Sequence, residues 1–456
     1  MSHRKLALCM ALVLLAASCQ TGPQPETASD VIAIVGATVI DGRSDSPLES
    51  ATLVIEGDTI RSVGAQGALE VPAGARRMEA AGKTIIPGMF NLHGHVALST
   101  AMERGLQHHT RENIQRDVNA YLYYGVTHVI SLGINGDAMQ SFVEDQQAGR
   151  VGGARIHSAG LGFAAQGGWR PADVEAIHRP TTPQEAQEMV REEASKGVGL
   201  IKLWVDDNLD QLPKLSPELY GAVIEEAHRH GIKVLAHLYE LDDAKELMRR
   251  GLDAMAHNVR DQEVDEEYLA LAAENGVTLI SVLVGTRSSV LYAEQRDFLN
   301  DPALPLLFPS SVLDVITSAE YQQRAASDVE RSRRQFAIAS RNTALSAAAG
   351  IPVAVGTDSQ GAGRLQGLWE HMELELLVDA GLTPMEAIHA ATLNAAAFLG
   401  IDDRFGTLEP GKVADFIVLN SDPLADITNS RDIDAVWMNG RPVDRPALAL
   451  PQPSGQ

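Results

Sequence analysis

The sequence predicts an α/β protein, a (β/α)₈ TIM barrel with a small β-sandwich domain formed from both chain ends. Through the centre of the chain, short apolar strands alternate with amphipathic helices, as in a parallel sheet covered by helices. Both ends instead carry short β-rich runs separated by Gly-Asp and Asp-Gly turns. A length of 456 residues suits one large domain and one smaller domain.

The N-terminal segment has the features of a secretory signal. Residues 2–5 (SHRK) are polar and basic, and residues 6–17 (LALCMALVLLAA) form an apolar run too short to span a bilayer. The run ends in Ala16-Ala17-Ser18-Cys19, which resembles the bacterial lipobox and implies lipidation of Cys19. The alternative is an ordinary signal peptide that is cut nearby.

We therefore expect residues 1–18 to be a signal peptide and residues 19–30, which are polar and contain Pro and Gly, to be a lipoprotein tether. The exported protein is then expected to be anchored in the bacterial cell envelope, on the periplasmic side of the outer membrane. Without lipidation it is expected to be periplasmic.

The β-sandwich domain is expected to combine residues 31–86 with residues 405–447, because neither end alone has enough strands for a sandwich. The barrel is expected over residues 87–404, and residues 448–456 are expected to be a flexible tail. One repeated barrel unit is typical: Ser216-Pro217 begins a helix that ends before Gly231, and the apolar strand IKVLAHLYE follows. A doubly wound open sheet is the alternative, which is disfavoured because no Gly-rich phosphate loop follows the first strand.

Composition excludes several classes of protein. The formal net charge is -23, and so acidic a chain would be repelled by phosphate backbones, which argues against nucleic-acid binding. The only two cysteines, Cys9 and Cys19, both lie in the N-terminal segment. A disulfide scaffold, a thiolate zinc site and a catalytic cysteine in the body of the protein are thereby excluded.

Ligand-type side chains occur near the carboxyl ends of several predicted strands, where barrel enzymes carry their chemistry. His93 and His95 lie two apart on one strand, so both can face one metal ion. Imidazoles together with a carboxylate suit zinc and related divalent ions. The full predicted ligand set is His93, His95, Lys202, His237, His257 and Asp358.

The motifs that carry these residues resemble those of a known family. PGMFNLHGH, GLIKLWVDD, VLAHLYE, DAMAHN and VGTDS are similar to the metal-ligand motifs of the amidohydrolase superfamily. AGLTPMEAIHAATLNAAAFLG and GTLEPGKVADFIVL resemble its imidazolonepropionase-like branch, close to a secreted subgroup of prolyl-dipeptidase-like enzymes and ochratoxin A amidases. Three positions depart from the family pattern: Asn91 replaces an Asp, His128 replaces a small polar residue, and Trp169 replaces a His.

The resemblance implies a binuclear centre with two divalent ions, zinc being expected, bridged by a carboxylated Lys202. His93, His95 and Asp358 would bind one ion, and His237 and His257 the other. A metal-bound hydroxide would attack the substrate carbonyl while Asp358 transfers the proton, so Asp358, Lys202 and His257 are the expected catalytic residues. An unmodified Lys202 leaves a mononuclear site open.

Substrate recognition is predicted from loops at the strand ends. Arg170, Arg260 and Arg287, with Arg179, can pair with a substrate carboxylate, and a surface salt bridge is the alternative for each. Residues 285–340 contain Phe298, Leu306, Leu307 and Phe308, and so long a segment indicates a lid, an oligomer contact or surface decoration.

We therefore expect a metal-dependent amidohydrolase that cleaves amide or peptide bonds of carboxylate-bearing substrates, such as dipeptides, N-acyl amino acids or ochratoxin A. The alternatives are a cyclic amide or imidazolone hydrolase and a non-catalytic envelope binding lipoprotein. The expected partner is a small-molecule substrate, the membrane is contacted only through the lipid anchor, and a homo-oligomer is expected.

Overall fold

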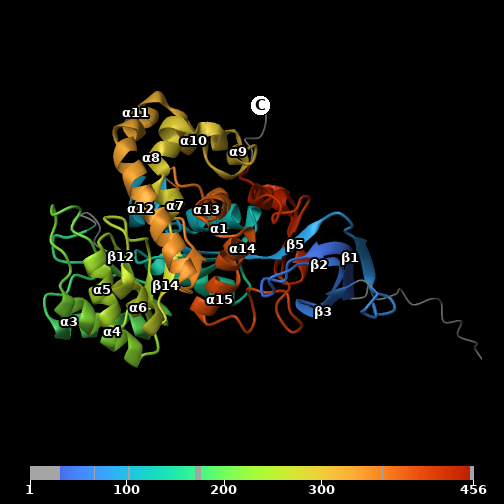
Figure 1. The fold of residues 1–456 in the computed structure, drawn as a ribbon, viewed down its shortest axis with the longest axis horizontal. Coiled ribbons are helices and arrows are strands. Elements are labelled where there is room, and N and C mark those ends of the chain that lie inside the picture. The colour runs from blue at the N-terminus through green and yellow to red at the C-terminus, as the bar shows by residue number, and fades with distance from the viewer. Residues whose placement is uncertain (1–30, 66, 101–102, 170–175, 362, 452–456) are drawn as a thin grey trace, which may run out of the picture.

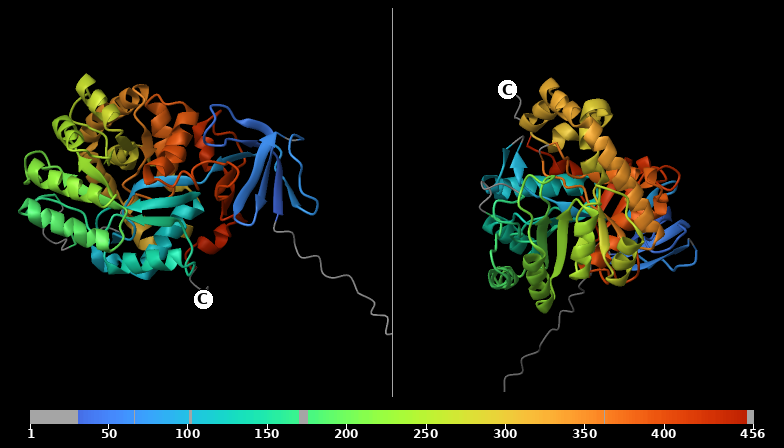
Figure 2. Two further views of the ribbon diagram at one scale, coloured as in Figure 1. Left: turned by 90° about the horizontal axis from the view of Figure 1, so that it is seen from below. Right: turned by 60° about the vertical axis from the view of Figure 1, so that its left-hand side comes forward.

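The fold is that of a computed structural model, which describes residues 31–65, 67–100, 103–169, 176–361 and 363–451. The predicted α/β class and the barrel with a separate β-sandwich domain are confirmed. The sandwich lies to one side of the barrel (Figure 1 and Figure 2). The signal peptide, the tether and Cys19 lie outside the described residues.

The β-sandwich domain draws its strands from both ends of the chain. Their hydrogen-bonded order is β18-β17-β16-β5-β1-β2-β3, with β4 paired to β1. Strand β5 joins the two ends, because it pairs with β1 on one side and with β16 on the other. The strands are β1 (Val31–Val39), β2 (Leu48–Glu56), β3 (Thr59–Ala65), β4 (Arg76–Glu79), β5 (Thr84–Pro87), β16 (Phe416–Leu419), β17 (Ile433–Met438) and β18 (Arg441–Pro442).

The barrel strands form two parallel sets, β10-β9-β6 and β11-β12-β13-β14-β15. Single parallel bridges between Gly94 and Ser359 and between Phe163 and Leu203 connect the sets on both sides, which closes the ring. The strands are β6 (Met89–Gly94), β9 (Val126–Ser131), β10 (Arg155–Ser158), β11 (Leu200–Val205), β12 (Lys233–Leu238), β13 (Ala254–Met255), β14 (Thr278–Ser281) and β15 (Val353–Val355). A small hairpin, β7 (Ser99–Thr100) and β8 (Glu103–Arg104), follows β6.

Helices surround the barrel strands, and α4 begins where the sequence predicts. Ser216 caps α4 by accepting from the backbone N–H of Leu219, and Pro217 occupies the first turn, where its missing N–H costs nothing. The helices are α1 (Arg111–Tyr123), α2 (Asp137–Gln147), α3 (Pro183–Ser195), α4 (Pro217–Arg229), α5 (Leu241–Arg249), α6 (Glu266–Glu274), α12 (Val329–Ala348), α13 (Leu368–Asp379), α14 (Pro384–Ala391) and α15 (Leu393–Leu399).

The segment between β14 and β15 is helical throughout much of its length rather than an irregular loop. Its short helices, most of them labelled in the upper part of Figure 1, lead into the long helix α12. Phe298, Leu307 and Phe308 are buried in the main hydrophobic core. The short helices are α7 (Leu283–Thr286), α8 (Ser288–Glu294), α9 (Leu304–Leu307), α10 (Ser310–Thr317) and α11 (Ala319–Ser327).

The segment IIPGMFNLHGH is divided between the two domains. Thr84–Pro87 belongs to the sandwich sheet, and the barrel strand β6 begins only at Met89. Gly88 allows the chain to pass between the two, because a Cβ there would lie 2.7 Å from the side chain of Thr127. Leu450, in the segment expected to be a flexible tail, donates its backbone N–H to the carbonyl of Leu306.

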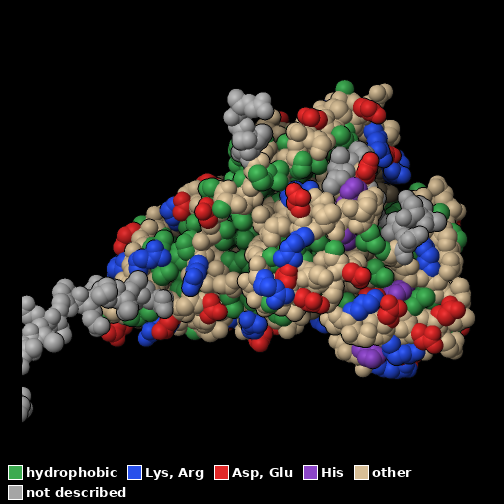
Figure 3. All heavy atoms as spheres, turned by 180° about the vertical axis from the view of Figure 1, so that it is seen from behind, with side chains coloured by type: hydrophobic (Ala, Val, Ile, Leu, Met, Phe, Trp, Pro, Cys, Tyr) green, Lys and Arg blue, Asp and Glu red, His purple; other side chains and the backbone are tan. Residues whose placement is uncertain are grey.

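Surface features agree with an ordinary globular domain. On the face seen in Figure 3, acidic and basic side chains are interspersed rather than gathered into one basic patch. Within the described ranges, no helix combines the length and the apolar character that crossing a bilayer requires.

Candidate metal centre

Strand alternation brings two of the predicted ligands into the barrel. On β11, Ile201, Leu203 and Val205 pack outward in the core beneath the helices, so Leu200 and Lys202 face inward. On β12, Val234, Ala236 and Leu238 do the same, so Leu235 and His237 face inward. Lys202 and His237 each lie two residues further along the strand than a buried leucine, at the end of the barrel that carries the other predicted ligands.

The end of β9 leaves room for Lys202 because it carries a glycine. Gly133 has φ 76°, and a Cβ there would lie 2.9 Å from the Cβ and Cγ atoms of Lys202. Lys202 itself is fully buried, with its Nζ atom 5.8 Å from the centre of the Trp204 ring. Glycine at position 133 therefore allows the backbone to pass close to the buried side chain of Lys202.

The other predicted ligands gather around His93. The ring centres of His93 and His257 are 4.6 Å apart, those of His93 and His95 are 5.5 Å apart, and those of His237 and His257 are 4.5 Å apart. Asp358 Oδ1 lies 3.0 Å from His95 Nε2 and 3.6 Å from His93 Nε2. These residues come from the ends of four strands, β6, β12, β13 and β15, and lie together in one cluster.

Electrostatics keep these groups in the protonation states that metal binding needs. Burial lowers the pKa of His93 and His257 well below the ordinary value and lowers that of His237 to about 4, so all three imidazoles are neutral at pH 7. The positive charge of Lys202 lowers the pKa of His93 and His237 further. Burial favours protonation of Asp358, but Arg364 and His95 hold its pKa well below the usual range, so it is a carboxylate.

This donor set fits divalent metal ions. Ligand atoms of the buried residues His93, His257 and Asp358 all lie within 4.8 Å of one another. Neutral imidazoles with free lone pairs and an ionised carboxylate are the ligands that zinc and related ions prefer. A buried amine close to two of these imidazoles suits the bridging position that the resemblance assigns to Lys202.

Asp206 supports one of the ligands and was not singled out from the sequence. Its Oδ2 atom lies 2.7 Å from His237 Nε2, and both side chains are buried. A carboxylate on one ring nitrogen fixes the tautomer of a histidine and leaves the other nitrogen, Nδ1, for a metal. The signal was present, since Asp206 directly follows the last residue of β11.

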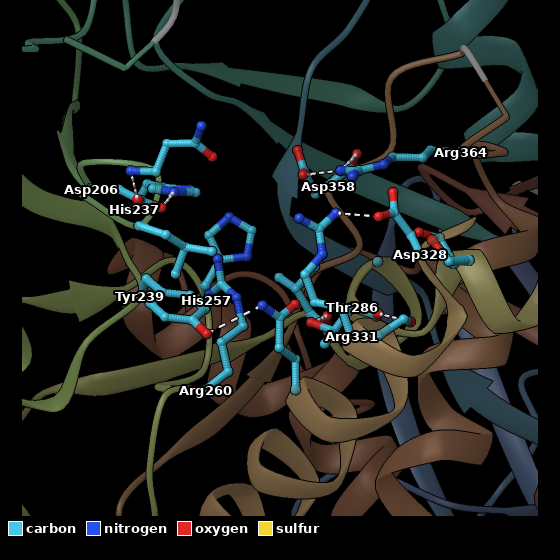
Figure 4. A pocket seen from close by; sticks show the side chains of 18 of the residues that line it. Asp206, His237, Tyr239, His257, Arg260, Thr286, Asp328, Arg331, Asp358 and Arg364 are labelled. Carbon is cyan, nitrogen blue, oxygen red and sulfur yellow. Dashed lines mark hydrogen bonds and ion pairs between the residues drawn. The ribbon is translucent and has the colours of Figure 1, made fainter. Parts of the chain in front are cut away.

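Two adjoining cavities open at the ligand cluster. One, of about 310 Å³, is lined by the histidines together with Trp169, Trp204 and Leu212. The other, of about 350 Å³, shares Trp169, His237, His257 and Asp358 with the first and extends to α8 and α12 (Figure 4). The ligand cluster therefore has a neighbouring space that a small molecule can occupy.

Three arginines line the larger cavity, and they differ in their partners. Arg364 pairs with Asp358, and Arg331 pairs with Asp328 at 2.9 Å (Figure 4). Arg260 donates to the backbone carbonyls of Leu238 at 2.9 Å and Asn258 at 3.1 Å. It makes no ion pair with any acidic side chain in the part of the chain that the structure describes.

The other predicted arginines lie elsewhere. Arg287 stacks on Phe336 and donates to Gln295, and it does not line either cavity. Arg179 donates to the carbonyl of Ala165, and Arg170 lies outside the described residues. Phe298, Leu307 and Phe308 do not line the cavities either, because they are buried in the core. Arg331 and Arg364 lacked a sequence signal, since one lies on an amphipathic helix and the other in a loop.

Two apolar side chains complete the walls. The Trp169 ring stacks on His237 at 5.0 Å, and its buried Nε1 atom has no hydrogen-bond partner among the described residues. Leu209 is 48% exposed at the edge of the larger cavity, in a turn where Asn208, Leu209 and Asp210 all have positive φ. His128 and His157, by contrast, lie among the aromatic rings inside the barrel, and His128 stacks on Phe90 at 4.2 Å.

Comparisons with known proteins agree with this geometry. The model of the amidohydrolase family matches residues 84–443. An ochratoxinase from Aspergillus niger is 27% identical over 277 residues, which are 58% of this chain and 50% of the relative. The chain thus spans about half the length of the first curated relatives that it matches.

Two further proteins are similar to this chain, one over a short stretch and the other over nearly its whole length. An imidazolonepropionase from Deinococcus deserti is 42% identical over 96 residues, 20% of this chain and 24% of the relative. The crystal structure of a candidate prolidase from Bifidobacterium longum has a TM-score of 0.73 at 26% identity, covering 92% of this chain and 96% of that chain. The resemblance that the sequence motifs indicate is confirmed.

Proposed function

Because the chain belongs to the amidohydrolase family, we propose that it hydrolyses amide or peptide bonds of small substrates that carry a carboxylate, such as dipeptides and N-acyl amino acids. The observation that carries this proposal is Arg260. Its half-buried guanidinium makes no ion pair with an acidic side chain among the described residues, and it lines the same cavity as His237, His257 and Asp358. An anionic group of the substrate would complete its environment.

We propose that His93, His95 and Asp358 hold one divalent ion and that His237 and His257 hold a second, with Lys202 carboxylated on its amine as the bridge. Zinc is the ion that this donor set favours. When bound, such ions polarise a carbonyl and lower the pKa of a coordinated water. Asp206 would keep His237 in one tautomer throughout.

Asp358 is the proposed proton carrier. It is a buried carboxylate whose Oδ1 atom faces the histidines, while its Oδ2 atom is held by Arg364. Oδ1 would take the proton of the attacking water and deliver it to the departing amine, since general acid–base transfer requires contact with both groups. Arg364 would keep the carboxylate oriented during the transfer.

Substrate orientation follows from the two cavities. Arg260, with Arg331 at the same wall, would bind the carboxylate of the leaving amino acid in the larger cavity. Trp169, Trp204 and Leu212 would contact an apolar or aromatic acyl group in the smaller cavity. Ochratoxin A combines an aromatic acyl group with phenylalanine, so its hydrolysis is a proposed activity of this site, in line with the similarity to an ochratoxinase.

Hydrolysis of a cyclic amide is the second candidate, favoured by the similarity to an imidazolonepropionase. The test is turnover of a panel of dipeptides, N-acyl amino acids, ochratoxin A and lactams, each acid accompanied by its carboxamide. Preferential cleavage of the linear acids is expected. Preferential ring opening would favour the second candidate, and binding without turnover of any compound would favour a binding lipoprotein.

We further propose that the protein is exported and anchored through Cys19, on the basis of the apolar run that precedes this residue. Cys19→Ser is expected to release the protein from the membrane fraction or to block its maturation. A wild-type protein that is wholly soluble after cell disruption would contradict the anchor.

A further inference from the structure

A buried glutamate on α13 lies behind the residues that flank Asp358. Glu370 is 1% exposed, and its Oε1 atom accepts hydrogen bonds from Asn91 Nδ2 at 2.5 Å, Thr357 Oγ1 at 2.8 Å and Ser359 Oγ at 3.4 Å. Asn91 lies two residues before His93, and Thr357 and Ser359 lie on either side of Asp358. One carboxyl oxygen therefore ties the end of β6 to the end of β15.

Asp358 needs such support because its backbone is strained. Its φ is 54°, in the left-handed region that a residue with a side chain adopts only at a cost in free energy. Backbone bonds hold it on one side, since its N–H donates to the carbonyl of His93 at 2.7 Å. The two neighbouring hydroxyls, both directed to Glu370, fix the peptide on each side of the strained residue.

The hydrogen bonds of this network can all be oriented towards Glu370. Tyr121 Oη contacts Ser359 Oγ at 2.6 Å, and Asn91 Nδ2 contacts Thr357 Oγ1 at 2.9 Å. Every chain of donors can then end on Glu370 Oε1. All five side chains are buried, so losing this acceptor would leave several donors without a partner and away from water.

We propose that Glu370 is a positioning residue that holds Asp358 and the β6 ligands in their metal-binding arrangement by acting as the shared acceptor of this network. This inference rests on the proposed function, because it concerns the geometry of the proposed metal ligands. Glu370 touches neither the ligands nor the cavities, so its role is exerted through Asn91, Thr357 and Ser359.

The acceptor atom, rather than a negative charge, is what the geometry requires. Glu370 Oε2 is buried and has no hydrogen-bond partner among the described residues. Burial also raises the pKa of Glu370 to about 7, which favours the neutral acid. Glutamine keeps the accepting oxygen and removes only the ionisable group, so Glu370→Gln should preserve the arrangement and Glu370→Met should not.

The chain offers a matched control one turn further along the same helix. Glu373 is equally buried and also accepts several hydrogen bonds, from Ser281 Oγ at 2.7 Å and from the backbone N–H groups of Leu283 and Val284. Its partners lie at the end of β14 and the start of α7, and none of them is a partner of Glu370. Glu373→Met therefore reproduces the loss of a buried carboxyl without touching the ligand network.

The experiment compares the zinc affinity of the wild type with that of three variants, Glu370→Gln, Glu370→Met and Glu373→Met. Zinc affinity is measured by competition with a chromophoric chelator. Thermal unfolding in excess chelator shows separately whether each variant is folded. Glu370→Met is expected to weaken zinc binding about 10- to 100-fold, the usual effect of losing support behind a metal ligand. With saturating zinc its kcat should fall while KM stays near that of the wild type. Glu370→Gln and Glu373→Met should stay within about threefold of wild-type affinity.

Zinc affinity of a folded Glu370→Met equal to that of the wild type would overturn the inference, as would equal losses in Glu370→Gln and Glu370→Met. If Glu370→Met does not fold, the double variant Thr357→Val/Ser359→Ala replaces it, with Ser281→Ala as its control. Only the double variant should lose affinity, and equal affinity in the two would also overturn the inference. A wild type that binds no zinc would instead refute the proposed function.

Discussion

The same strands line both halves of the barrel interior, but the two halves differ in chemistry. The lower half is the one that contains Leu200 and Leu235, and the upper half is the one that contains Lys202 and His237. In the lower half, Leu200 on β11 and Leu235 on β12 face inward and pack in an apolar cluster beside α15. Two residues further along the same strands, Lys202 and His237 face inward at the ligand cluster. The strands therefore provide an apolar core at one end and the proposed metal site at the other.

The apolar half of the barrel offsets the unfavourable free energy of burying the polar groups in the other half. Burying an amine, four imidazoles and a carboxylate in one place is unfavourable without ligands, because each loses contact with water. The lower half contains well-packed aliphatic and aromatic side chains, whose burial is favourable. Substitutions in the upper half should then change chemistry more than stability, and those in the lower half the reverse.

Asp358→Asn should have the largest effect on the upper half. The amide retains the shape of the side chain but cannot take a proton, so kcat should fall by about 10²- to 10⁴-fold with metal content measured on the same sample. Asp253→Asn is the control, since Asp253 accepts from Val234 N and lies near His228 at the opposite end of the barrel. Similar kcat values for Asp358→Asn and the wild type would remove Asp358 from the proposed proton transfer.

Leu235→Ala should lower the stability of the protein and leave kcat nearly unchanged. Leu235 is fully buried in the lower cluster, and truncation leaves a cavity, so the free energy of unfolding should fall by about 2–5 kcal/mol. Turnover per folded molecule should stay near that of the wild type. Urea unfolding and kcat at a temperature where the variant is folded measure the two quantities, and a large fall in kcat would break the comparison between the halves.

Arg260→Gln should affect only substrates with a carboxylate. Losing one charged hydrogen-bond partner is expected to cost about 2 kcal/mol in kcat/KM for the acid and much less for the matching carboxamide. Arg287→Gln serves as a control, because Arg287 lies outside both cavities. An equal loss for the acid and the amide would show that Arg260 acts on the fold rather than on the carboxylate.

A further expected effect is a pH dependence of stability. Burial raises the pKa of Glu370 from its ordinary 4.5 to about 7, so between these values the folded protein holds a proton that the unfolded chain releases. Wild-type stability should therefore fall as pH rises through this window, by at most about 1.4 kcal/mol per pH unit from this group. Glu370→Gln removes that contribution, and its unfolding free energy relative to the wild type should rise with pH in urea titrations of metal-free protein. Parallel curves would contradict the shift.

The proposed ligands could be predicted because they interrupt apolar strands. Lys202 within LIKLWV and His237 within KVLAHL stand out against their neighbours, and the spacing of strands and helices then predicts the barrel. Asp358 was predicted from its place after the last strand. The assignment of roles to these residues stays a prediction, as do the domain boundaries.

Other parts of the site could not be predicted, for physical reasons. Arg331 lies on α12 among many surface charges, and nothing local distinguishes the face that lines the cavity. Glu370 lies on a helix that is buried nearly all round, so its polar residues show no periodic pattern. Between β14 and β15, Phe298, Leu307 and Phe308 are buried in the core and Leu306 is exposed. Other residues of the same segment line the larger cavity, and its apolar pattern alone does not show which side chains do so.

In the proposed metal centre, the upper half of the barrel would hold two divalent ions with Lys202 between them. The test is the metal content per chain, measured together with hydrolytic activity on purified wild type and Lys202→Ala. We expect close to two ions in the wild type, as the six proposed ligands imply, and loss of both metal and activity in Lys202→Ala. A fully active enzyme with a single ion, unaffected by Lys202→Ala, would contradict the claim.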